Sequence, residues 1–100
     1  MILGVTRESA KGTIAGTVVF TGPTTGSSIA FEGKISNLDS TNKVSHFVSL
    51  NVGGAFLFRD VEVPYGSTLA TLKFVIGQGE SVIFYSDVDN TAEISLAVKS

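Results

Sequence analysis

The sequence predicts an all-β protein, an antiparallel immunoglobulin-like β-sandwich of seven or eight strands. Apolar and polar residues alternate with a period of two over residues 29–36, 48–52 and 94–99. Such alternation places one set of side chains on a buried sheet face and the other in solvent. Turn-forming clusters of Gly, Pro, Asp, Asn and Ser recur at intervals of roughly 10–12 residues, as in sandwich folds. No stretch has the periodicity, caps and length of a helix.

The predicted elements follow these breaks in order. We expect a single sandwich domain over residues 12–100, preceded by an N-terminal arm or edge strand over 1–11. Residues 7–11 are a polar stretch that closes the arm, and 60–63 lead into the turn at 64–67. Within the expected strand 68–76, residues 69–74 are a strand or irregular. The expected strands cover 1–6, 12–21, 28–38, 44–52, 55–59, 68–76, 81–86 and 92–99.

The alternation also predicts the core and one turn. In the turn at 64–67, Tyr65 should lie at the tip and Gly66 should have positive φ, as a type II turn requires. The residues expected to be buried together are Phe31, Ile35, Val48, Leu50, Ile94 and Leu96.

Composition excludes several classes of function. The formal net charge is −2 and the seven basic residues are scattered, which argues against nucleic acid and anionic membranes as partners. The chain has no cysteine, so a disulfide framework and a thiolate zinc site are excluded, as fits folding in a reducing cytoplasm. No secretory signal or membrane span is recognisable. Only 16% of residues are charged, against about 25% usually, which favours oligomerisation or docking on a partner.

The polar residues predict no catalytic site, cofactor or metal. His46 stands alone in a strand, with no orienting carboxylate or further ligand nearby in sequence, and we expect a structural or surface role. Asp87, Asp89 and Asn90 resemble alternating calcium ligands, but the loop lacks the length, glycine and glutamate of an EF-hand. We interpret them as hairpin-turn residues.

Exposed aromatic residues are the best candidates for contacts. If Val48 and Leu50 point inward, Phe47 points outward; Phe56 and Phe58 are expected to share one face, opposite Leu57. A strand that is apolar on both faces often presents one of them to a partner. Sugar binding is the competing explanation, although the chain has two Tyr and no Trp.

Part of the chain resembles small β-sandwich virion proteins of tailed bacteriophages. The resemblance covers about residues 29–98 and rests on the turn and strand patterns of 33–41, 61–69 and 73–81. It implies a capsid decoration (cement) protein that binds the outer capsid surface and stabilises the head without catalysis. It also implies a virion location after synthesis in the host cytoplasm, with the major capsid protein or another virion protein as partner.

Two alternatives remain open: a head–tail neck or tail structural protein, and a non-catalytic carbohydrate-binding module that depends on Tyr65 or Tyr85. We further expect a homo-oligomer, with a trimer favoured. The interface candidates are Met1, Ile2, Leu3, Val5, Phe47, Phe56, Phe58 and Tyr65.

Overall fold

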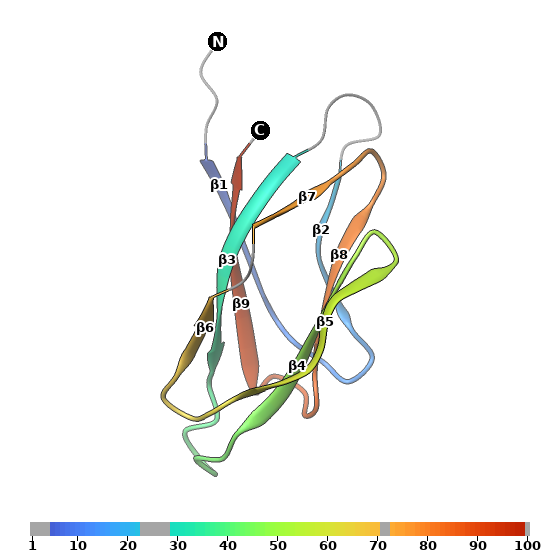
Figure 1. Ribbon diagram of the computed structural model, residues 1–100. Helices are drawn as coiled ribbons and strands as arrows, with labels where there is room; N and C mark the ends of the chain where they lie inside the picture. The colour runs from blue at the N-terminus through green and yellow to red at the C-terminus, as the bar shows by residue number, and fades with distance from the viewer. Residues whose placement is uncertain (1–4, 23–28, 71–72, 100) are drawn as a thin grey trace.

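A computed structural model describes residues 5–22, 29–70 and 73–99, which form a two-sheet antiparallel β-sandwich (Figure 1). The described residues contain strands and turns and no helix, hence no helix that could cross a membrane. The strands are β1 (Val5–Lys11), β2 (Thr17–Thr21), β3 (Ile29–Asn37), β4 (His46–Val52), β5 (Ala55–Val63), β6 (Thr68–Ala70), β7 (Phe74–Ile76), β8 (Ser81–Ser86) and β9 (Ala92–Lys99).

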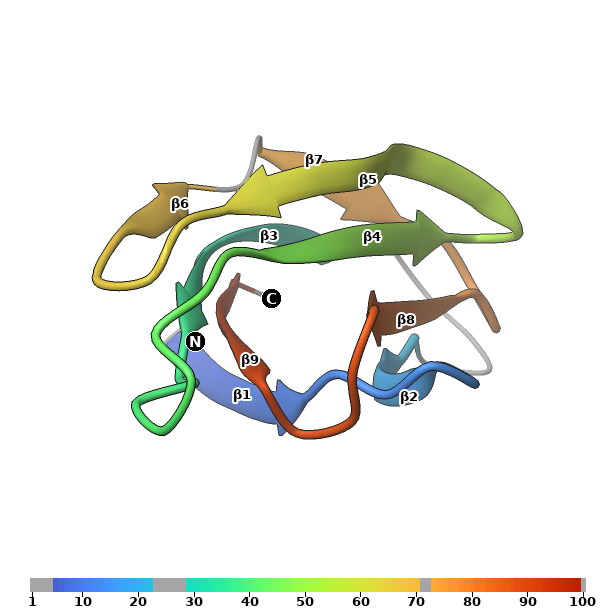
Figure 2. The same cartoon turned by 90° about the horizontal axis from the view of Figure 1, so that it is seen from below.

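The two sheets have different orders. The five-stranded sheet runs β1-β9-β3-β6, with β7 also pairing with β3, and the four-stranded sheet runs β2-β8-β4-β5. All strand pairs are antiparallel. Viewed from below, the strands surround a common interior (Figure 2). The predicted fold class is therefore confirmed.

The strand boundaries differ from expectation in four places. The expected strand 68–76 is described as two short strands, β6 and β7, which both pair with β3 and bring the count to nine. Residues 60–63 belong to β5 rather than to a connection. Residues 7–11, expected to be a polar stretch that closes the arm, are part of β1, because they pair in register with β9. Residues 12–16 precede β2 rather than belonging to it; a bridge between Thr13 and Tyr85 and a hydrogen bond from the Gly12 N–H to the Ala92 carbonyl oxygen connect them to the two sheets.

The hydrophobic core lies between the sheets where the alternation placed it. All six predicted core residues are at most 2% exposed and belong to one buried cluster. Phe31 also stacks on Phe74, with ring centroids 5.3 Å apart, and meets Phe20 edge to face at 5.2 Å. Alternation therefore gave the correct inward register for β3, β4 and β9.

The molecule is elongated, with principal extents of 46 × 26 × 18 Å. Val5 pairs with Lys99, so the start of β1 and the end of β9 lie at the same end of the sandwich (Figure 1). The turns after β3 and β8 lie at the opposite end, beyond the Lys11–Glu93 pair. The fold thus has two distinct ends at which function could be placed.

Candidate functional site

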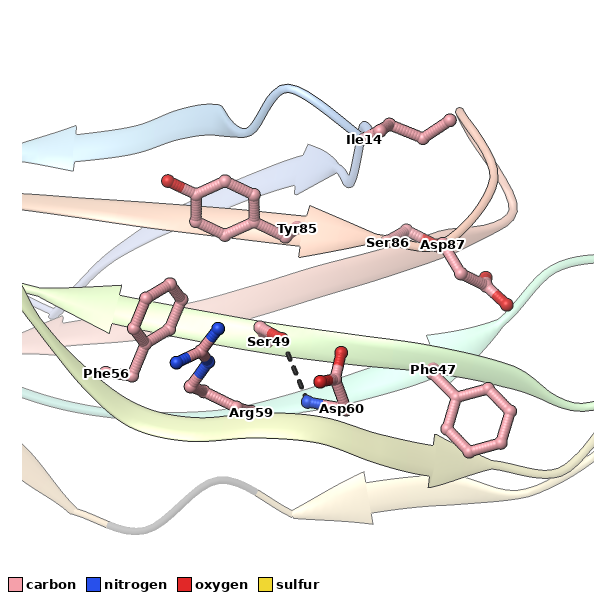
Figure 3. Close-up of a pocket in the computed structure, with 9 residues that line it drawn as sticks. All are labelled: Ile14, Phe47, Ser49, Phe56, Arg59, Asp60, Tyr85, Ser86 and Asp87. Carbon is pink, nitrogen blue, oxygen red and sulfur yellow. Dashed lines mark hydrogen bonds between the residues drawn. The ribbon is translucent and has the colours of Figure 1, made fainter.

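A pocket of about 260 Å³ opens on the outer face of the four-stranded sheet (Figure 3). Three aromatic side chains line it: Phe47 from β4, Phe56 from β5 and Tyr85 from β8. Phe47 is 45% exposed and Phe56 is 41% exposed. The polar lining of the pocket comes from Ser49, Arg59, Asp60, Ser86 and Asp87, and Ile14 completes the rim.

A bulge in β5 creates the polar part of this pocket. Val48 pairs with Val61 and Leu50 with Phe58, so two residues of β5, Arg59 and Asp60, lie opposite Ser49 alone. Asp60 has a φ of 50°, a conformation that Asp tolerates better than most residues. Its backbone N–H donates a hydrogen bond of 2.9 Å to the Ser49 hydroxyl. Both Arg59 and Asp60 consequently project outward.

A second bulge corrects the expected arrangement of the aromatics on β5. Leu50 pairs with Phe58 and Asn51 with Phe56, so Leu57 is an extra residue between them. An extra residue reverses which face the following side chains occupy. Phe58 is partly buried against the core, whereas Phe56 is exposed on the outer face. The expectation that Phe56 and Phe58 share a face is therefore wrong.

The aromatic wall of the pocket is held by close packing. The Phe56 and Tyr85 rings have centroids 5.7 Å apart and planes inclined at 44°. Gly16, with a φ of 96°, lies against Tyr85, and a Cβ there would come within 2.6 Å of the ring. Only glycine accommodates both this φ and this contact. The Arg59 guanidinium carbon lies 4.7 Å from the Phe56 ring centroid, in cation–π contact.

A buried histidine braces one side of the pocket. His46 is 4% exposed; its Nε2 lies 2.7 Å from Oδ2 of Asp39 and its Nδ1 lies 2.8 Å from Oδ1 of Asp87. Ionised carboxylates only accept hydrogen bonds, so His46 donates to both Asp39 and Asp87 when both ring nitrogens carry protons and the imidazole is cationic. Asp87 in turn lines the pocket, and its N–H donates to the Phe47 carbonyl oxygen.

The pKa shifts of His46 and Asp39 agree with a cationic imidazole that lies between two carboxylates. Burial lowers the pKa of His46, but the hydrogen bonds to Asp39 and Asp87 outweigh it, so the pKa is raised above 6.5. The hydrogen bond from His46, followed by that from the Asn42 N–H, holds the pKa of Asp39 below 3.8. With both nitrogens donating to carboxylates, His46 is engaged in a structural bridge and is not poised as a general base or metal ligand.

The interface candidates that the structure describes lie on different parts of the molecule. Met1, Ile2 and Leu3 lie outside the described residues, and Val5 begins β1 at the end remote from the β3 and β8 turns. Tyr65 is 42% exposed in the turn between β5 and β6, where it is not part of the pocket. Of the candidates within residues 5–22, 29–70 and 73–99, Phe47 and Phe56 are the two that share the pocket.

Sequence reasoning missed the polar half of the site. Arg59 and Asp60 read as ordinary strand or turn residues, and only the bulge opposite Ser49 makes them neighbours on one face. Asp87 lies in the predicted turn after β8, and Asp39 lies in the turn after β3, where it accepts a hydrogen bond from the Asn42 N–H. Asp89 likewise accepts a 2.8 Å bond from the Ile14 N–H. Among the described residues, no group of three or more His, Cys, Asp or Glu side chains is arranged to hold a metal ion.

Comparison with known proteins identifies the fold. No family model and no curated protein matches the chain. A solved structure from the Bacillus endospore appendages, described as a novel family of disulfide-linked pili, is similar with a TM-score of 0.56 and 12% identity, over 98% of this chain and 85% of that one. The EclA C-terminal domain, a sugar-binding protein, is similar with a TM-score of 0.51 and 19% identity, over 99% of this chain and 79% of that one. At these identities the likeness shows a shared β-sandwich fold.

Proposed function

We propose that this protein is a non-catalytic virion structural protein that attaches to a bacteriophage capsid as a decoration subunit. The observation that carries the proposal is the free edge of β1. In the described part of the chain, β1 pairs with β9 along one side and with no strand along the other. An open edge of seven residues can accept a strand from another protein through main-chain hydrogen bonds.

The register identifies the backbone groups that would bind. Gly12 N–H donates to the Ala92 carbonyl oxygen, continuing the β1–β9 register, so residues 12, 10 and 8 form the hydrogen-bonded pairs. The N–H and C=O groups of Ser9 and Lys11 then point to the open edge. In the sequence the apolar residues Met1-Ile2-Leu3 are separated from this strand by Gly4 alone, and we propose that they add an apolar contact with the partner.

Other observations support a structural role. The low charge content favours a protein that covers surface in an assembly, and the turn and strand patterns resemble phage virion proteins. One structural neighbour is a pilus protein, so this fold is compatible with a subunit role; the chain itself contains no cysteine for disulfide linkage. We propose a trimer as the assembled form and the major capsid protein as the partner that supplies the docking strand.

The test is attachment to capsids that lack this protein. Ser9→Pro removes an N–H that points to the open edge while leaving the ladder to β9 intact, and Ser9→Thr keeps that N–H as the matched control. We expect Ser9→Pro, and deletion of residues 1–4, to reduce the fraction that co-sediments with capsids, and Ser9→Thr to bind normally. Capsids without the protein should release DNA at a lower temperature.

Two results would overturn the proposal. The edge is not the attachment site if Ser9→Pro occupies capsids as fully as the unmodified protein. The virion role itself fails if the purified protein binds no capsid, neck or tail component and light scattering shows only a monomer.

A further inference from the structure

We propose that the pocket bounded by Phe56, Tyr85, Arg59 and Asp60 is a binding site for one ring of a neutral saccharide. This goes beyond the structural role proposed above and uses a different surface. The pocket includes Ile14 from the β1–β2 connection and Asp87 from the end of β8, remote from Val5. The pocket opens on the outer face of the four-stranded sheet, whereas β1 is an edge strand of the five-stranded sheet, so a subunit anchored along β1 would leave this face open to solvent.

The aromatic wall has the shape that a sugar ring requires. A pyranose presents C–H groups on its faces and hydroxyls around its rim, and the C–H faces pack on aromatic rings. The Phe56 and Tyr85 rings are inclined at 44° and the Arg59 guanidinium covers one face of Phe56, so a sugar ring would pack on Tyr85 and on the part of Phe56 that Arg59 leaves uncovered. Phe47, whose ring lies on the far side of Asp60 in Figure 3, extends the apolar surface.

The polar groups match the hydroxyls of such a ligand. The Asp60 carboxylate offers acceptors and the Arg59 guanidinium offers a planar set of donors, and together they suit adjacent hydroxyls that both donate and accept. Among the described residues, neither side chain has an ion-pair partner that would occupy it. Apolar walls with a few convergent polar groups are the usual composition of small-ligand sites.

Charge and size narrow the class of ligand. Asp87 is already paired with His46, so the free charges of the pocket are those of Asp60, which would repel an anionic sugar or a phosphate, and of Arg59, which would repel a cation. A neutral ligand meets neither penalty. The volume of about 260 Å³ lies just below the roughly 300–1,000 Å³ of drug-sized ligand sites, which suits one sugar ring and predicts a Kd on the order of 1 mM.

The site is prearranged by the sheet. Ser49 anchors the Asp60 backbone, Gly16 seats the Tyr85 ring and His46 holds the Asp87 carboxylate. Side chains held on strands by such contacts lose little freedom on binding. The bulge therefore places Arg59 and Asp60 beside the aromatic wall before any ligand arrives.

The experiment is a titration of the isotope-labelled protein followed by NMR. The ligands are the methyl glycosides of glucose, galactose, mannose and N-acetylglucosamine, with methyl glucuronide as the charged comparator. We expect at least one neutral glycoside to shift the amide signals of Phe56, Arg59, Asp60 and Tyr85, and the glucuronide to bind more weakly.

Three variants locate the effect. Tyr85→Ala removes one wall and should weaken binding roughly tenfold. Asp60→Asn keeps a residue that tolerates positive φ but removes the charged acceptor, and should weaken binding roughly threefold to tenfold. Tyr65→Ala removes an exposed tyrosine outside the pocket and should leave binding unchanged. If Tyr85→Ala does not fold, as judged by its thermal unfolding, Asp60→Asn decides.

Several outcomes would overturn the proposal. These are no shift with any of the four neutral glycosides, stronger binding of the glucuronide, or loss of binding with Tyr65→Ala in place of Asp60→Asn. Capsid attachment is measured separately on Ser9→Pro. A protein that binds sugar but no capsid thus refutes the structural role alone, and the converse refutes only the saccharide site.

Discussion

His46 and Asp39 form a buried ion pair, with Nε2 2.7 Å from Oδ2 and both side chains at most 7% exposed. Through its second nitrogen His46 also reaches Asp87, so one imidazolium joins the turn after β3 to the turn after β8. These turns connect strands of opposite sheets. The two ion pairs of His46 therefore link the two sheets at one end of the sandwich, beyond the apolar core.

Replacing His46 by Gln should destabilise the fold. Gln can still donate hydrogen bonds but leaves Asp39 and Asp87 without the cation between them, and a buried unpaired charge is costly. We expect the melting temperature near pH 6 to fall by roughly 5–15 °C. Asp89→Asn, at the same end of the molecule, keeps an acceptor for the Ile14 N–H and should have a much smaller effect. Equal effects of the two substitutions would mean that the bridge is unimportant.

Stability should depend on pH in two directions. The folded pKa of His46 is raised above 6.5, so its contribution is complete below pH 6.5 and is lost as the pH rises through the folded pKa. The folded pKa of Asp39 is lowered below 3.8, so its contribution is complete above pH 3.8 and is lost as the pH falls through the folded value. Thermal unfolding measured from acidic to alkaline pH should show that the His46 bridge stabilises the fold most between pH 3.8 and pH 6.5. Because His46 is the only histidine, His46→Gln should remove most of the decline just above neutrality.

Truncating a side chain should destabilise the fold at the positions where the alternation predicts burial. Leu50 and Leu96 are fully buried on strands of opposite sheets, and changing either to Ala should lower the free energy of unfolding by about 2–5 kcal/mol. Val75, 58% exposed on β7, provides the control, because Val75→Ala should change the free energy of unfolding by less than about 0.5 kcal/mol. Denaturant unfolding measures this free energy for all three variants. An unchanged midpoint for either leucine variant would contradict the observed register.

Local pattern predicted the core well and the site poorly, for a physical reason. Burial of Leu50 or Leu96 follows from alternation within one strand, which the sequence displays directly. The partners of His46 depend on tertiary pairing, since Asp87 is 41 residues away. The outward position of Arg59 and Asp60 depends on a bulge that exists only when β5 pairs with β4. Turn chemistry lies between these cases: Gly66 has the positive φ, 81°, that its place after Tyr65 predicted.

The stability lost on replacing Gly66 by another residue should depend on backbone strain alone. The Ser67 N–H donates to the Pro64 carbonyl oxygen, which places Gly66 at the turn position that needs positive φ. A Cβ there would meet nothing within 4 Å, so no clash contributes. Gly66→Val should therefore cost about 1–3 kcal/mol and Gly66→Asn clearly less, since Asn adopts positive φ more readily. Identical stabilities of the two variants would argue against a strained turn.

The second bulge in β5 makes Phe56 and Phe58 respond differently to the same substitution. Phe58 packs against the core, so Phe58→Ala should lower the free energy of unfolding by roughly 2–4 kcal/mol. Phe56 loses only its contacts with Tyr85 and Arg59, which are worth about 1–2 kcal/mol together at an exposed site. Denaturant unfolding of the two variants compares them directly. Without the extra residue at Leu57 both rings would lie on one face and the two costs would be similar, so a similar loss for both variants would contradict the bulge. A large difference would show that β5 contributes the Phe58 ring to the core and the Phe56 ring to the pocket.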